Sequence, residues 1–185
     1  FGMLPFYLSG SIDSLTNAFF ETMSGFTTTG ATILDDIESL SHGMLFWRSL
    51  TQWIGVLGIV FFTIAVLPVF TSGGVQLFSA ESTGVTHDRT HPKINVMAKW
   101  LWTVYLILTL AETILLMLGG MSLFDAVCQS FATTATGGYS TKQASISYWN
   151  SPFIEYVVAI FMLLSGVNFA LFLMCLRGKV SRLLR

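Results

Sequence analysis

The sequence predicts an all-α membrane protein made of repeated units, each a helix, a re-entrant half-helix with its loop, and a second helix. Composition is the first observation: 53% of the 185 residues are hydrophobic and only 10% are charged. An ordinary soluble domain has roughly 25% charged residues, so this chain cannot cover its own surface with charge. In addition, two apolar segments are too short to span a bilayer, and a threonine- and glycine-rich run follows each of them.

The first unit is expected over residues 1–70, with an outer helix that is truncated. Its half-helix is expected at about residues 12–25, because serine and aspartate residues cluster at the start and favour helix initiation. About a dozen helical residues fall short of the ~20 needed to cross hydrocarbon, which favours a segment that enters and leaves on one side. The loop over residues 26–32 follows, and the inner helix is expected over residues 43–70.

The second unit repeats this order over residues 96–176, after a polar connection at residues 71–95. Its parts are an outer helix at 96–120, a half-helix at 122–133, a loop at 134–141 and an inner helix at 152–176. A basic tail occupies residues 177–185. The first residues of the chain resemble the end of an apolar span, so we expect this sequence to be part of a longer chain.

Basic residues predict the orientation in the membrane, because lysine and arginine favour the cytosolic side. Most of them lie in or beside the middle connection or in the tail: Arg89, Lys93, Lys99, Arg177, Lys179, Arg182 and Arg185. Both places are cytosolic if the three long helices run inward, outward and inward. Both half-helices then enter from outside, where the acidic residues Asp35, Asp36 and Glu38 also fall.

The two loops have the composition of an ion-coordinating site. A half-helix that enters from outside points its C-terminal end, with roughly −0.5 of an elementary charge, toward the membrane centre. Glycine lets successive carbonyl groups turn toward an ion, and rings of carbonyls can replace a hydration shell. The candidate ion-binding residues are Thr27, Thr28, Thr29, Gly30, Thr134, Ala135, Thr136, Gly137 and Gly138.

The register between the loops has two solutions. Asn17-Ala18 aligns with Asp125-Ala126, but Thr29-Gly30 aligns with Thr136-Gly137 only if one residue is gained or lost. Alternatively, Gly30 matches Gly138. The pattern alone leaves both alignments open.

Two ionisable residues inside the long spans, Arg48 and Glu112, indicate a function or an ion pair. They could meet at similar depth, although Glu21 in the first half-helix competes for Arg48. We interpret these three residues as structural support for the loops. The two cysteines lie in apolar surroundings without metal-ligand spacing, so we expect no transition-metal site. We expect neither an enzyme nor an organic cofactor on this chain, and a net charge of −1 gives no reason to expect a nucleic-acid partner.

Four stretches together resemble the TrkH/KtrB potassium transporter family. Residues 20–32 and 124–141 are similar to its first and second pore loops, and residues 46–55 and 166–170 to the helices that follow them. The resemblance implies a potassium-channel-like transporter with four helix–pore-loop–helix units in one chain around a single pore. This sequence holds two of the four loops, and alone it should not conduct.

The resemblance also implies partners and a location. These are the remaining pore units of the same chain, a second copy in a homodimer, a cytosolic nucleotide-binding regulatory subunit and the lipid of the bacterial inner membrane. The transported ion would be potassium, and glycine at the filter position resembles the potassium-selective members. The alternatives are a sodium-permeable member of the family and a non-conducting membrane scaffold or receptor subunit with re-entrant loops.

Overall fold

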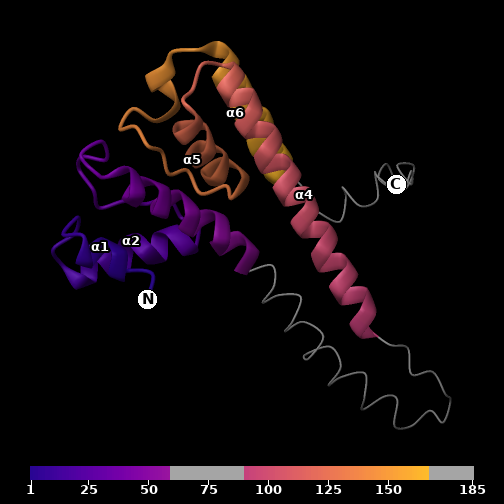
Figure 1. Ribbon diagram of the computed structural model, residues 1–185, viewed down its shortest axis with the longest axis horizontal. Coiled ribbons are helices and arrows are strands. Elements are labelled where there is room, and N and C mark those ends of the chain that lie inside the picture. The colour runs from indigo at the N-terminus through magenta and orange to yellow at the C-terminus, as the bar shows by residue number, and fades with distance from the viewer. Residues whose placement is uncertain (59–89, 167–185) are drawn as a thin grey trace, which may run out of the picture.

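The computed structural model describes residues 1–58 and 90–166, and within these ranges the chain is helical and has no strands. Figure 1 shows two groups of helices beside each other. The first group contains α1 (Leu4–Leu8), α2 (Leu15–Phe26) and a helix over residues 42–58. The second contains the longer helix α4 (Thr90–Leu118), α5 (Leu123–Thr134), the short 3₁₀ helix η1 (Ser145–Trp149) and α6 (Pro152–Gly166).

The helix α4 is long and apolar enough to cross a membrane. Its segment Leu101–Leu118 has a mean hydropathy of 2.0, and 18 residues of helix rise about 27 Å, close to the thickness of the hydrocarbon layer. The helix α6 is a shorter apolar helix in the part of the chain that the structure describes. The predicted continuations of the inner helices, over residues 59–70 and 167–176, and the basic tail lie outside the described residues, as does most of the polar connection.

Each group packs around its own apolar core. In the first group Phe6, Ala18 and Met44 bring α1, α2 and the helix over 42–58 together. In the second, Leu116 and Ile154 are among the buried residues that join α4, α5 and α6. Both half-helices are therefore held against the neighbouring helices of their own group.

Trp53 joins the two groups. Its indole ring stacks on the rings of Tyr105 at 5.4 Å and Phe131 at 5.1 Å, which belong to α4 and α5. The indole nitrogen donates a hydrogen bond to the hydroxyl of Thr109 at 3.1 Å, and the Tyr105 hydroxyl donates to the Trp53 carbonyl at 3.3 Å. The helix over residues 42–58 is thus fixed against both α4 and α5.

Candidate functional site: two loops at the ends of the half-helices

The half-helices α2 and α5 end where the two candidate loops begin. Helix α2 is capped at its C-terminal end by Thr27, and α5 is capped by Ala135. Both helices are 12 residues long, so each rises only about 18 Å, well short of the ~30 Å of a bilayer's hydrocarbon layer. Their C-terminal ends direct partial negative charge into the loops, which suits a cation rather than an anion.

The two loops have the same backbone conformation. Thr28 and Thr136 have φ angles of 54° and 52°, and Gly30 and Gly138 have φ angles of 75° and 82°. The hydrogen bonds repeat as well, since the Thr28 amide donates to the Gly25 carbonyl at 3.0 Å and the Thr136 amide donates to the Thr133 carbonyl at 2.9 Å. A left-handed backbone at a threonine is uncommon, and its recurrence at the same place marks the two loops as structural equivalents.

This geometry settles the register that the sequence left open. Gly30 matches Gly138, and Thr29 matches Gly137, without gain or loss of a residue. The amides of Thr29 and Gly137 agree with this alignment, because they donate to the carbonyls of Ser24 and Ala132 at 3.0 and 2.8 Å. The alternative that paired Gly30 with Gly137 does not fit the backbone.

The loops touch each other at their glycines. A Cβ atom at Gly30 would lie 2.1 Å from the carbonyl oxygen of Gly137, so no side chain fits there without movement of the backbone. At Gly138, by contrast, a Cβ atom would meet nothing within 4 Å. Equivalent backbone positions in the two loops therefore have different surroundings.

The carboxylate of Glu21 is the centre of a buried polar network beside the first loop. It accepts a hydrogen bond from Arg48 Nε at 3.0 Å, and both side chains are almost completely buried. The Thr32 hydroxyl also donates to it at 2.9 Å, and the Ile33 amide at 3.1 Å. Of the two partners that the sequence allowed for Arg48, the structure pairs it with Glu21. Several charge-assisted hydrogen bonds offset the cost of burying this ion pair.

Arg48 and Tyr139 extend this network to the second loop. The guanidinium group donates to the carbonyl of Ser140 at 3.4 Å and lies over the ring of Tyr139, 4.1 Å from its centre. The Tyr139 hydroxyl lies 3.1 Å from the carbonyl oxygen of Glu21 and 3.2 Å from that of Ala31. Ala31 lies 108 positions before Tyr139 and is its equivalent in the first loop. A single side chain of the second loop therefore contacts both the first half-helix and the first loop.

The helix over residues 42–58 packs behind both loops. A Cβ atom at Gly55 would lie 2.1 Å from the carbonyl oxygen of Phe26, and one at Gly137 would lie 2.3 Å from the side chain of Gln52. The amide oxygen of Gln52 also accepts a hydrogen bond from the Tyr139 amide at 3.3 Å. Sequence reasoning did not assign these contacts to Gln52, Gly55 or Tyr139, because no local pattern tells which helix lies behind a loop.

Glu112 lies apart from this network, on the side of α4 that faces α5. It is completely buried, and neither of its carboxylate oxygens has a hydrogen-bond partner. Figure 1 shows the shorter helix α5 beside α4, and the two helices are in contact. Among the described residues, no group of three histidine, cysteine, aspartate or glutamate side chains is arranged to hold a metal ion.

Together, the helical architecture and the paired loops define the fold class of the protein, an all-helical membrane protein with pore-loop repeats. Residues 3–185 match the family model TrkH, described as cation transport protein, and the chain belongs to this family. The predicted fold class and family are confirmed.

Named relatives agree with this assignment. The Trk system potassium uptake protein TrkH of Escherichia coli is 47% identical over 180 residues, and that of Vibrio parahaemolyticus is 43% identical over 172 residues. The crystal structure of the potassium transporter TrkH from Vibrio parahaemolyticus superimposes with a TM-score of 0.79 at 38% identity, covering 96% of this chain and 35% of that one. The chain also spans only 37% of the length of the Escherichia coli relative.

Proposed function

We propose that this chain supplies two of the pore-loop units of a potassium uptake transporter. The observation that carries the proposal is the pair of loops with one backbone conformation, each at the C-terminal end of a half-helix and in contact with the other. The names of the relatives, which are potassium uptake proteins, support potassium as the ion.

The ion would pass the two loops without leaving a polar environment. Backbone carbonyl groups would replace part of its hydration shell, and the partial negative charge at the ends of α2 and α5 would add to the attraction. Under the observed register, the equivalent pairs are Thr28 with Thr136, Thr29 with Gly137, and Gly30 with Gly138. Thr27, Thr134 and Ala135 would close the helix ends beneath these pairs, and Glu21 and Arg48 would keep the loops in place.

The complete transporter would be assembled from a longer chain. Two further pore-loop units of that chain would close the pore, and two copies would form a homodimer in the bacterial inner membrane. A cytosolic nucleotide-binding subunit would regulate it. The exposed apolar side chains of α4, such as Ile107 at 58%, Leu110 at 62% and Leu118 at 75%, suit contact with lipid or with these additional units.

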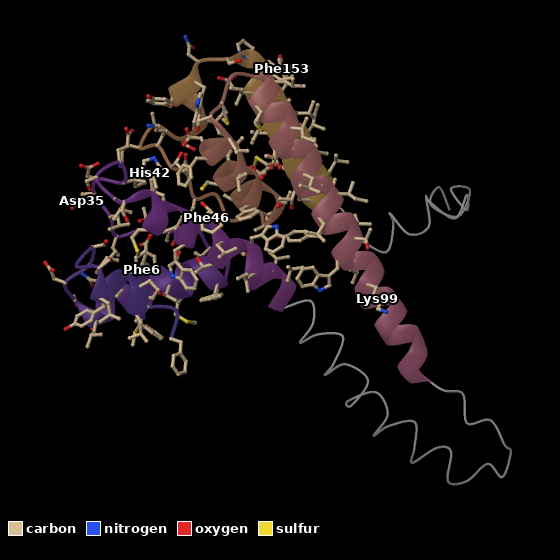
Figure 2. All side chains as sticks on the ribbon, viewed as in Figure 1. Phe6, Asp35, His42, Phe46, Lys99 and Phe153 are labelled. Atoms are coloured by element: carbon tan, nitrogen blue, oxygen red, sulfur yellow. The ribbon has the colours of Figure 1, made fainter. Side chains whose placement is uncertain are left out.

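The proposed arrangement places residues 1–70 and 96–176 as successive units, with both half-helices entering from outside. The polar connection and the basic tail would then be cytosolic. Figure 2 supports this orientation, since Asp35 in the acidic loop and Lys99 on α4 lie at opposite ends of the described part of the molecule.

Growth of potassium-uptake-deficient bacteria at low potassium tests this function. The full-length chain should restore growth, and a version with both loops replaced by flexible linkers of equal length should not, although it reaches the membrane. If the two versions restore growth equally, the loops do not form the ion path, whereas failure of both versions would favour the non-conducting scaffold. Sodium uptake by the full-length chain without restored growth would instead identify a sodium-permeable member.

A further inference from the structure

Glu112 is a buried carboxyl group without a counter-charge. Its side chain is 0% exposed, and both of its oxygens lack a hydrogen-bond partner. Within residues 1–58 and 90–166, no basic side chain forms an ion pair with it. An ionised carboxylate in such surroundings is strongly disfavoured, so the group must be neutralised.

The first unit shows how this protein neutralises a buried carboxylate. There Glu21 accepts hydrogen bonds from Arg48, Thr32 and the Ile33 amide. In the second unit the position equivalent to Glu21 is occupied by the uncharged Gln129. The helix that follows the second loop, α6, contains no arginine, lysine or histidine. The second unit therefore has no arginine that could form an ion pair with Glu112 as Arg48 does with Glu21.

Other titratable groups on the surrounding elements do not supply the missing charge. Arg48 is engaged by Glu21. Asp125 on α5 accepts hydrogen bonds from Ser122 and Thr141 and is itself acidic. The basic residues of α4, which are His91, Lys93 and Lys99, precede Glu112 by at least 13 residues, about 20 Å of helix. The other titratable groups of α4, α5 and α6 are not basic: Tyr105, Cys128, Glu155 and Tyr156.

The polar side chains between α4 and α5 show what Glu112 meets. Hydroxyl pairs join the two helices above and below it, Thr113 with Ser130 at 2.7 Å and Thr109 with Thr134 at 3.3 Å. Thr133, which is also buried, lies between Ser130 and Thr134 in the last turn of α5. Glu112 thus faces the last turn of the second half-helix, immediately before the loop.

The hydroxyl proton of Thr133 already forms a hydrogen bond within α5. Its hydroxyl donates to the backbone carbonyl of Gln129 at 2.9 Å, so it can only accept a hydrogen bond from Glu112. The side-chain amide of Gln129 donates to the same hydroxyl at 3.4 Å, and its own oxygen has no partner. The oxygen atoms of Thr133 and Gln129 at this end of α5 can therefore accept a hydrogen bond, and a proton on Glu112 gives its carboxyl group a hydrogen bond to donate.

We infer that Glu112 is a protonated, neutral acid that donates a hydrogen bond to Thr133 and so positions the end of the second half-helix. It is a positioning residue and does not contact the ion. A neutral Glu112 also leaves the end of α5 with only its helix-dipole charge. Binding at the second loop would then stay weak enough for an ion to leave, as permeation requires.

Infrared difference spectroscopy of the purified full-length protein tests the charge directly and does not depend on the proposed function. The wild-type spectrum minus that of Glu112→Gln at neutral pH should contain the carbonyl stretch of a protonated carboxylic acid. A difference spectrum that contains carboxylate bands instead would overturn the inference, because Glu112 would then be ionised. The matched control is Glu155→Gln, an exposed residue of α6 whose difference spectrum should contain carboxylate bands.

Potassium uptake kinetics, which rest on the proposed function, test the positioning role. Glu112→Gln keeps a neutral donor of the same shape, so its KM and maximal rate should stay within about threefold of wild type. Glu112→Leu leaves the buried polar groups of α5 without that donor and should lower the maximal rate about tenfold or more at similar KM. A large rise in KM in both variants would show that the negative charge of Glu112 binds the ion, and would overturn the inference. Failure of Glu112→Gln to fold would also contradict it, and absence of uptake in the wild-type protein would count against the proposed function alone.

Discussion

The two pore-loop units share a backbone but are braced by different chemistry. In the first, the half-helix carries Glu21, and a buried ion pair with Arg48 holds the adjoining loop. In the second, the equivalent half-helix position is the neutral Gln129, and the loop is held by the side chains of Tyr139 and Gln52 together with a hydrogen bond from Arg48 to the Ser140 carbonyl. The comparison teaches that one loop geometry can form beside a half-helix with a buried carboxylate or beside one with a neutral side chain at the same position.

The loops also differ in exposure. The side chains of Thr27 and Thr29 in the first loop are exposed and their hydroxyl groups lie 2.9 Å apart, whereas the equivalent Ala135 and Gly137 are buried. The second loop packs against the helix over residues 42–58 and against the first loop. Perturbations of the first loop should therefore act mainly through its ion pair, and those of the second through packing.

The largest effect should come from breaking the ion pair. Replacement Arg48→Met leaves the Glu21 carboxylate buried and unpaired, which we expect to cost about 3–5 kcal/mol of stability and to abolish potassium uptake. Thermal unfolding of the detergent-solubilised full-length protein measures the first effect, and uptake in deficient cells the second. The control is Lys99→Met, which removes an exposed cation from α4.

A double variant makes this test sharper. Glu21→Gln combined with Arg48→Met removes both charges, so its stability should exceed that of Arg48→Met alone. Normal expression, stability and uptake in Arg48→Met would show that the first loop needs no ion pair.

The second largest effect should distinguish the two equivalent glycines. Gly30→Ala drives a methyl group into the Gly137 carbonyl and adds a side chain at positive φ, at a cost of about 3 kcal/mol. Gly138→Ala meets open space and should cost only about 1 kcal/mol, for the backbone conformation alone. Equal losses of thermal stability in the two variants would mean that the loops do not touch as described.

A smaller effect is expected from removal of one hydroxyl group. Tyr139→Phe keeps the ring under Arg48 but loses hydrogen bonding to the carbonyls of Glu21 and Ala31, at a cost of about 1–2 kcal/mol. Tyr148→Phe, at a 52% exposed position, serves as the control and should be neutral. An unchanged unfolding temperature for both variants would remove Tyr139 from the bracing of the loops.

The smallest effect concerns the outer surface. Lys142 and Glu38 form a partly exposed pair at 3.5 Å that links the segments following the two loops. Exposed pairs contribute about 0–1 kcal/mol, so Lys142→Met should change the unfolding free energy little, and less still at high salt. A loss as large as that of Arg48→Met would contradict the view that buried groups brace the loops.

Much of this fold follows from the sequence, because a dozen helical residues between polar termini cannot span a bilayer. The identity of the family followed from the motifs around residues 20–32 and 124–141. The equivalent of Gly30 in the second loop could not be identified from the sequence, since both Gly137 and Gly138 are compatible with the residue pattern. Only the φ angles at Thr28 and Thr136 decide between them.

The partners of the ionisable residues were also beyond the sequence. Glu21 and Glu112 both lie at a depth that Arg48 could reach, and only the direction in which each helix face points selects Glu21. The contact of Tyr139 with the first half-helix joins residues 118 positions apart, a separation over which local patterns carry no information.

Ion selectivity of the full-length chain with Gly138→Ser tests the central claim most directly, because a Cβ atom fits at this position. The measurement is the ratio of potassium to sodium uptake in deficient cells, with expression and thermal stability as controls. If the two loops are equivalent parts of one filter, the preference for potassium should fall by about tenfold, a free-energy change of about 1.4 kcal/mol. Gly30→Ser should lower it in the same direction. An unchanged ratio in a stable, well-expressed Gly138→Ser protein would contradict the account.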